Sequence, residues 1–223
     1  MHYSNDIYID LGTSNTLIYS QKMGFLLNQP SLVAVDQRRT YPSLVHAGHV
    51  AYSMLGKTPQ GVSVSRPLSE GVIADFDSTL SMLEAFLIQL RHQVRFVKPR
   101  VVISLPCVVS YFERKSVEEV VKRLGARSVY LIDEPIAAAI GAGLQVLDRR
   151  GSMVIDIGGG TTEIAVVSMG GIVACQAVRI GGNTIDAEIM GHLRLYHQFA
   201  VGEQTAEKIK KGVARLDPRI EKT

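Results

Sequence analysis

The chain has 223 residues, 46% of them hydrophobic and 20% charged, which is typical of a globular protein with a sizeable buried core. Its net charge of +3 is too small to indicate nucleic-acid binding, and no basic run is interleaved with aromatic residues, so no nucleic-acid partner is expected. The amino terminus lacks the apolar run of a signal peptide. The longest apolar stretch, residues 136–147, is too short to cross a bilayer.

The first predicted element is a hairpin that starts with the apolar strand of residues 7–11 and continues into a second strand, residues 17–19. The turn between them contains Gly12, Thr13, Ser14 and Asn15. Glycine accepts positive φ, and short polar side chains bond back to the local backbone, so this composition favours a tight turn. Several backbone N–H groups of such a turn point to one place and form a concave site for phosphate.

Asp10 stands immediately before this turn. A carboxylate beside a polyphosphate would be repelled unless a cation lay between them, so its position indicates a hydrated divalent metal, for which magnesium is expected. The alternative is that Asp10 only caps the turn.

The next part of the chain predicts a strand at residues 31–35 and then a polar, irregular stretch, residues 36–71, which is broken by three prolines. We expect a small inserted subdomain over about residues 33–75. From Thr79 onward, apolar residues at helical spacing predict a helix that buries one face, formed by Leu83, Phe86, Leu87, Leu90 and Val94.

The segment 91–100 places Phe96 and Val97 among several cations in an expected loop. An exposed apolar pair ringed by positive charge suits an anionic membrane surface. The alternative is that Phe96 packs beneath its own loop.

Two strands, at residues 100–106 and 128–132, are predicted on either side of a helix. Ser110 with Glu113 three residues later forms a capping-box pattern, so this helix is expected to begin there and to run through Leu124. A further helix is predicted over residues 136–146, with Glu134 at its amino-terminal end because proline suits the first helical turn.

The hairpin pattern then recurs, with the strand of residues 153–157, Asp156 before the turn, and the run Gly158, Gly159, Gly160, Thr161. A second strand follows at residues 164–167. Two such hairpins facing each other would hold a nucleotide's phosphates from both sides, with the two aspartates on the metal. Because the pattern restarts here, a domain boundary is expected, which gives domains of residues 1–147 and 148–223.

The two cysteines, Cys107 and Cys175, lie in apolar, strand-like stretches. They are interpreted as small, reduced core residues, and this is favoured over a metal site or a disulfide.

Three motifs in order, at residues 10–16, 133–143 and 156–163, resemble the actin-like ATPase superfamily and, within it, the MreB family of bacterial actins. Supporting stretches are residues 28–31, 66–68, 71–76, 178–182 and 202–210. The resemblance implies an α/β, actin-like (ribonuclease H-like) fold with two related domains around a nucleotide cleft. Relatives of this kind continue for roughly another domain, so the second domain is expected to be incomplete.

The resemblance also implies roles for matching residues. The phosphates of ATP would be held by both turns, magnesium by Asp10 and Asp156, and Glu134 would orient the attacking water with help from Thr161. Glu207 and Lys210, one helical turn apart, match residues that contact the nucleoside. The alternatives are that Glu134 only caps its helix and that Glu207 and Lys210 are a charge pair on a solvated face. The residues implied in phosphate binding are Gly12, Thr13, Ser14, Asn15, Gly158, Gly159 and Gly160.

At the level of function, the resemblance implies a cytoplasmic cytoskeletal ATPase that hydrolyses ATP slowly and polymerises into filaments governing cell shape. Its partners would be copies of itself, the inner face of the cytoplasmic membrane and envelope proteins of cell-shape control. One alternative is a nucleotide-dependent switch such as a chaperone-like ATPase or a sugar kinase, although no substrate acid or base and no peptide-binding domain is evident. A second alternative is a degenerate or truncated partner that binds nucleotide without turnover.

Overall fold

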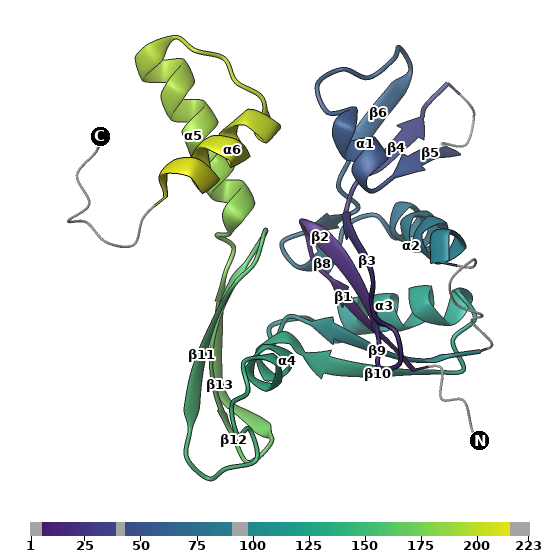
Figure 1. Ribbon diagram of the computed structural model, residues 1–223, viewed down its shortest axis with the longest axis vertical. Coiled ribbons are helices and arrows are strands. Elements are labelled where there is room, and N and C mark those ends of the chain that lie inside the picture. Colours follow the sequence, from purple (N-terminus) through teal and green to yellow (C-terminus); the bar gives the residue numbers. More distant parts are fainter. Residues whose placement is uncertain (1–5, 39–42, 91–97, 215–223) are drawn as a thin grey trace.

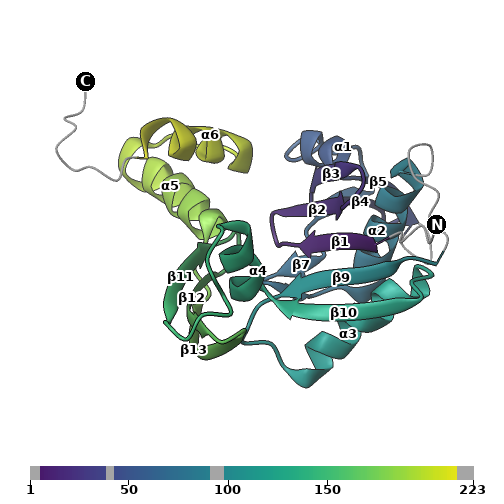
Figure 2. The same cartoon turned by 60° about the horizontal axis from the view of Figure 1, so that its bottom comes forward.

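The structure is a computed structural model that describes residues 6–38, 43–90 and 98–214. It contains a mixed α/β fold in two halves, connected by a short helix, α4 (Glu134–Gly141), that contacts a sheet in each half (Figures 1 and 2). The α/β class predicted from the sequence is confirmed.

The first half is built on a five-stranded sheet in the order β10-β9-β1-β2-β3. β1 runs parallel to β9 and antiparallel to β2, and β9 runs parallel to β10. The strand bounds are β1 Asp6–Leu11, β2 Asn15–Ser20, β3 Gly24–Pro30, β9 Arg100–Leu105 and β10 Ser128–Asp133.

The core lies on the face of this sheet covered by α2 (Phe76–Leu90) and α3 (Tyr111–Arg123). In β1 the side chains alternate, so Ile7, Ile9 and Leu11 are buried in the core while Tyr8 and Asp10 lie on the opposite face. The strand period therefore directs Asp10 away from the core. Buried helix residues on the core side include Met82, Leu83, Phe86, Val117, Val120 and Val121.

The predicted helix boundaries hold for α3 and fail in part for α4. Ser110 caps α3, with its Oγ accepting from the Glu113 N–H and the Glu113 carboxylate accepting from the Ser110 N–H, so the capping box is present. α4 ends at Gly141, five residues earlier than expected. The backbone turns at Gly143, whose φ of 77° is left-handed and ends the helix.

The segment expected to be irregular contains regular structure. β4 (Val33–Asp36), β5 (Ser43–Ala47) and β6 (Val62–Ser65) form a three-stranded antiparallel sheet in the order β5-β4-β6. A short helix, α1 (His49–Ser53), buries Ala51 against Leu32 and Ala34. The strand predicted at residues 31–35 corresponds to β4, whereas β5 and β6 were missed. β6 pairs with β4 from a distance in sequence, and β5, which follows β4 along the chain, lies in the polar stretch that was interpreted as irregular. A two-stranded ribbon, β7 (Leu68–Ser69) with β8 (Val72–Ile73), leads to α2.

The second half begins with an antiparallel sheet, β11 (Ser152–Ile157), β12 (Thr162–Ser168) and β13 (Gly171–Val178), followed by α5 (Gly182–His197) and α6 (Glu203–Val213). α5 and α6 pack on each other beyond one end of this sheet (Figure 1). None of the described helices is both long enough and apolar enough to span a membrane.

The expectation for the two cysteines is wrong. Cys107, in the loop between β9 and α3, and Cys175, on β13, form a disulfide across the two halves, and neither is a fully buried core residue. The apolar surroundings of each cysteine are local, whereas their pairing depends on how the two halves face each other, and that is not visible in either stretch.

Removal of the α3 cap is expected to destabilise the first half. Ser110→Ala should lower the free energy of unfolding by about 1 kcal/mol, because the Glu113 N–H loses its acceptor. Urea denaturation followed by circular dichroism measures this, with Ser116→Ala as control because the Ser116 hydroxyl only bonds back to the Phe112 carbonyl within the helix. Equal losses in both variants would contradict the assignment.

Candidate functional site

The two predicted hairpins have the same turn geometry. In the first, the Gly12 N–H donates to the Asn15 carbonyl at 3.1 Å, and in the second the Gly158 N–H donates to the Thr161 carbonyl at 2.8 Å. In each hairpin the last residue of the first strand pairs with the first or second residue of the next, Leu11 with Thr16 and Ile157 with Thr162. The repetition seen in the sequence is thus a repetition of structure.

The two turns touch each other across the halves. A Cβ added to Gly159 would lie 1.9 Å from the Ser14 Oγ, and one added to Gly160 would lie 2.8 Å from the Thr13 Oγ1. No side chain fits at either distance, so glycine at these two positions is what permits the close approach. Ser14 also donates to the Asn183 Oδ1 at 2.8 Å, which ties the first turn to the start of α5.

A cavity of about 750 Å³ lies between the hairpins and α4. It extends along the outer face of the five-stranded sheet, where its lining is apolar. The residues predicted to hold phosphate and metal or to act in catalysis all line its polar part: Asp10, Gly12, Thr13, Ser14, Asn15, Glu134, Asp156, Gly158, Gly159, Gly160 and Thr161.

Asp10 and Asp156 face this cavity from opposite halves. Protein atoms displace much of the water around Asp10, which raises the pKa of its carboxyl group, and the nearby charge of Asp156 raises it further. A hydrogen bond from the Ser104 Oγ at 3.1 Å acts in the opposite direction. Partial burial also raises the pKa of Asp156.

Glu134 is the most strongly perturbed of the acidic groups at the cavity. Burial, followed by the charges of Asp10, Glu163 and Asp156, raises the pKa of Glu134 to about 8. The residue opens α4 directly after β10, and Pro135 in the first helical turn fixes this start. Its carboxyl group is therefore carried on a rigid helix end.

The acidic cavity fits a cation better than it fits a bare anion. Among the described residues that line it there is no lysine, arginine or histidine, so three carboxyl groups share it without a positive side chain. Asp10, Glu134 and Asp156 also do not form a described trio whose ligand oxygens all lie within 4.8 Å of one another. A magnesium ion that keeps its water shell suits such widely spaced carboxylates, since magnesium dehydrates reluctantly.

Glu207 and Lys210 lie outside this cavity. Glu207 accepts a hydrogen bond from the Tyr52 hydroxyl at 2.8 Å and pairs with Lys211, and Lys211 is the main cause of its lowered pKa. It lines a neighbouring cavity of about 230 Å³ that shares Ser14 and Asn15 with the first. Lys210 points elsewhere: its Nζ bonds to the Asp186 carboxylate and the Gly182 carbonyl, both at 2.8 Å.

Contacts of α6 with α1 and with the residue after β6 border this second cavity. The Gln204 side chain donates to the Tyr52 carbonyl at 2.6 Å, and Arg66 forms an ion pair with Glu203. These contacts join the two halves on the side away from α4.

Two residues that form hydrogen bonds with side chains of the main site were missed in the sequence. Ser104 lies next to Asp10 in the parallel β1–β9 register, and Asn183 follows the Gly181-Gly182 pair that opens α5. The available signal for Ser104 was a polar residue at the end of an apolar strand. For Asn183 it was an amide side chain directly after two glycines. The predicted membrane residues Phe96 and Val97 lie outside the described residues.

Comparison with known proteins gives consistent matches over the whole chain. The family described as MreB/Mbl protein matches residues 4–223. The cell shape-determining protein MreB of Escherichia coli (strain K12) is 47% identical over 220 residues, which is 97% of this chain and 63% of that protein. The chain therefore spans less than two thirds of the length of this relative.

Solved structures have a similar fold. The crystal structure of MreB5 of Spiroplasma citri bound to ADP matches with a TM-score of 0.89 and 34% identity, and the match covers 98% of this chain and 65% of that one. The form bound to AMPPNP matches with a TM-score of 0.90. The MamK double helical filament matches with a TM-score of 0.76 at 17% identity, over 97% of this chain and 68% of that one, which supports the fold alone. The fold is thus actin-like, with an incomplete second domain.

Because the pKa of Glu134 is raised in the folded state, the free energy of unfolding depends on pH. The unfolded side chain loses its proton near pH 4.5, whereas the folded one keeps it to about pH 8, so the folded state loses stability as the pH rises through this window. Glu134→Gln should therefore be more stable than the parent at pH 8, by about 1 kcal/mol or more, and the gain should shrink toward pH 5. Chemical denaturation at both pH values tests this. A gain independent of pH would contradict it.

Substitution at the contact between the turns should be costly. Gly159→Ala forces Ser14 away from the second turn, and we expect a loss of roughly 1–3 kcal/mol in the free energy of unfolding. The matched control is Gly191→Ala on α5, where an added Cβ meets no atom within 4 Å and alanine favours the helix. If both variants unfold at the parent's midpoint, the two turns are not packed as described.

Proposed function

The chain belongs to the MreB/Mbl family, and from this premise we propose that it binds ATP with magnesium between its two hairpins and acts as a cytoskeletal ATPase of cell-shape control. The observation that carries the proposal is the convergence of two glycine turns and three carboxyl groups on one cavity. The solved relative bound to ADP and to AMPPNP supports nucleotide as the ligand.

In this proposal, the backbone N–H groups of the two turns hold the phosphates, since both turns are compact and their glycines leave the amides uncovered. Asp10 and Asp156, which line the cavity from opposite halves, would hold the metal. Bound magnesium supplies neutralisation of phosphate charge. The chain's contribution is to fix both phosphate and metal between two halves that can move relative to each other.

Glu134 and Thr161 are the proposed catalytic residues. Glu134 holds and orients the attacking water from the rigid start of α4, and the Thr161 hydroxyl helps from the second turn. Burial, followed by the charges of Asp10, Glu163 and Asp156, raises the pKa of Glu134 to about 8. A bound cation would offset that repulsion and lower the pKa, and the Glu134 carboxylate would then accept a hydrogen bond from the water that it orients.

The nucleoside is proposed to occupy the neighbouring cavity, which opens from Ser14 and Asn15 toward Glu207. Glu207 and Lys210 would then contact the ribose or base after exchanging their present partners, Tyr52 and Asp186. Nucleoside binding in this cavity would therefore require both side chains to change their contacts.

Filament formation through contacts with further copies, association with the inner face of the cytoplasmic membrane and contacts with envelope proteins are proposed from the family alone. The relative's name, cell shape-determining protein, supports this assignment, and a filament is described for MamK.

A second candidate function is a nucleotide-binding switch that docks on another protein without polymerising. The outer edge strand favours it, because Met153, Ile155 and Ile157 on β11 are 55–67% exposed and form an apolar stripe. The two candidates differ in whether the chain assembles with itself.

Nucleotide binding is tested by titrating AMPPNP in the presence and absence of magnesium. We expect the metal to strengthen binding, and Asp156→Ala to remove this gain, because the metal loses one of its two anchors. Asp148→Ala, an exposed acid outside the cavity, is the matched control and should behave as the parent. Metal-independent binding in the parent would contradict the proposal.

Turnover is tested by single-turnover phosphate release. Glu134→Ala should slow release by roughly 100-fold while AMPPNP binding stays within about twofold. The control is Glu119→Ala on the exposed side of α3, where the glutamate only pairs with Arg123. Unchanged release in Glu134→Ala would leave the residue as a helix cap and nothing more.

Assembly is tested by sedimentation with ATP and magnesium. Nucleotide-dependent pelleting that is lost in Asp156→Ala supports the cytoskeletal function. Tight binding without pelleting at any concentration supports the switch.

A further inference from the structure

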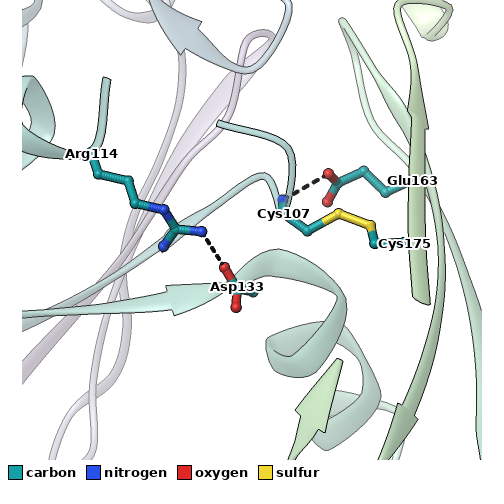
Figure 3. Close-up of a disulfide and its surroundings, with 5 residues drawn as sticks. All are labelled: Cys107, Arg114, Asp133, Glu163 and Cys175. Atoms are coloured by element: carbon teal, nitrogen blue, oxygen red, sulfur yellow. Dashed lines mark hydrogen bonds and ion pairs between the residues drawn. A yellow bond between two sulfur atoms is a disulfide. The ribbon is translucent and has the colours of Figure 1, made fainter. Parts of the chain in front are cut away.

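The disulfide is a second covalent tie between the two halves. The backbone passes from the first half to the second once in the described residues, through α4 and residues 142–151. Cys107 lies on the first half and Cys175 on the second, at a sequence separation of 68, and the segment between them includes α4. The bridge (Figure 3) therefore closes a covalent ring that includes the backbone connection between the two halves.

Both anchor points lead directly to the candidate site. Cys107 follows Ser104, the hydrogen-bond donor to Asp10, by three residues on the same chain segment. Cys175 pairs with Ala165 on β12, the strand that leaves the second turn. The bridge thus joins two segments that each neighbour one acidic hairpin, β9 beside β1 and β13 beside β12.

Two further contacts surround the bridge. Glu163, only 2% exposed, accepts the Cys107 N–H at 2.9 Å through its Oε1, and among the described groups its Oε2 has no partner (Figure 3). Arg114 of α3 pairs at 2.6 Å with Asp133, the residue before Glu134 (Figure 3). The loop that carries Cys107 is therefore packed between the second sheet and the start of α4.

The chemistry at this place favours thiol–disulfide exchange over metal binding. The Cys107 and Cys175 sulfurs lie within 4.8 Å of a Glu163 oxygen, a set that resembles metal ligands, but the sulfurs are bonded to each other, which removes both as ligands. Each cysteine is only partly buried, so neither half of the bridge is enclosed in the core. Disulfides of reducing compartments are usually transient and redox-sensing.

We propose that the Cys107–Cys175 bridge is a reversible redox latch that restrains opening of the cavity between the two hairpins. Its oxidised form limits rotation about α4, and its reduced form leaves the backbone connection as the only covalent tie. The effect on nucleotide rests on the proposed function, whereas the restraint on the halves does not.

The exchange balances with a dithiol as reductant. A thiolate of the dithiol attacks one Sγ of the bridge, the Sγ–Sγ bond breaks, and a mixed disulfide forms while the other cysteine leaves as a thiolate and takes up a proton. The second thiol of the reductant then closes its own disulfide and releases the remaining cysteine. Two electrons and two protons pass from the dithiol to Cys107 and Cys175, and oxidation by a small disulfide is the reverse.

The first experiment counts thiols and measures stability without nucleotide. Purified chain equilibrated with oxidised glutathione should show no free thiol under denaturing conditions, and two after dithiothreitol. Its Tm should fall by about 5–10 °C on reduction. The double variant Cys107→Ser/Cys175→Ser should have the Tm of the reduced parent, and dithiothreitol should not change it. Two free thiols after oxidation, or an unchanged Tm, would overturn the latch.

The second experiment measures the restraint at the connection. Hydrogen exchange in residues 134–143 should be at least about fivefold slower in the oxidised parent than in the reduced parent, and redox-independent in the double variant. Equal exchange in both forms of the parent would also overturn the proposal.

The third experiment follows release of a fluorescent ATP analogue from the oxidised and reduced parent. We expect release to be at least about fivefold slower from the oxidised form. Equal rates would refute control of the nucleotide by the bridge. Absence of analogue binding in both forms would refute the proposed function instead, while thiol counts, Tm and hydrogen exchange still decide on the latch.

Discussion

Burial of three carboxyl groups around one cavity is the constraint around which this molecule is organised. Asp10, Glu134 and Asp156 face this cavity, and none of the described residues lining it supplies a positive charge. Burial is the largest cause of the raised pKa at each group, and repulsion between the carboxylates adds to it at Asp10 and Glu134. Three buried carboxyl groups without a neighbouring positive side chain suit a ligand that includes a cation. We propose that this ligand is magnesium with a triphosphate.

The positions of the three carboxyl groups are set mainly by the backbone elements that carry them. Strand alternation in β1 buries Ile7, Ile9 and Leu11 and so turns Asp10 to the opposite face. β11 carries Asp156 into an equivalent turn, and Pro135 sets the start of α4 at Glu134. Because the carboxyl groups belong to two halves and the helix between them, any change in the angle between the halves alters their spacing. That coupling is why a bridge at Cys107 and Cys175 matters for the site.

The sequence allowed prediction of the features that depend on a few neighbouring residues. The turns at Gly12 and Gly158 and the capping box at Ser110 are encoded locally, and the repetition of the hairpin indicated that the two aspartates belong to one site. The strand β6 was missed because its partner β4 is distant in sequence, and β5 was missed because it lies in a polar stretch without a clear strand pattern. The Cys107–Cys175 pairing and the position of Glu207 beside Tyr52 depend on how the halves face each other, which no local pattern records.

A double-mutant cycle on the metal-dependent part of AMPPNP binding tests the central claim most directly, with Asp10→Asn, Asp156→Asn and the combined variant measured by calorimetry with and without magnesium. If both aspartates hold one ion, either substitution removes most of the gain that magnesium gives, and the combination removes little more. Losses that add independently, or a gain from magnesium that survives in the combined variant, would show that the two hairpins do not share a metal.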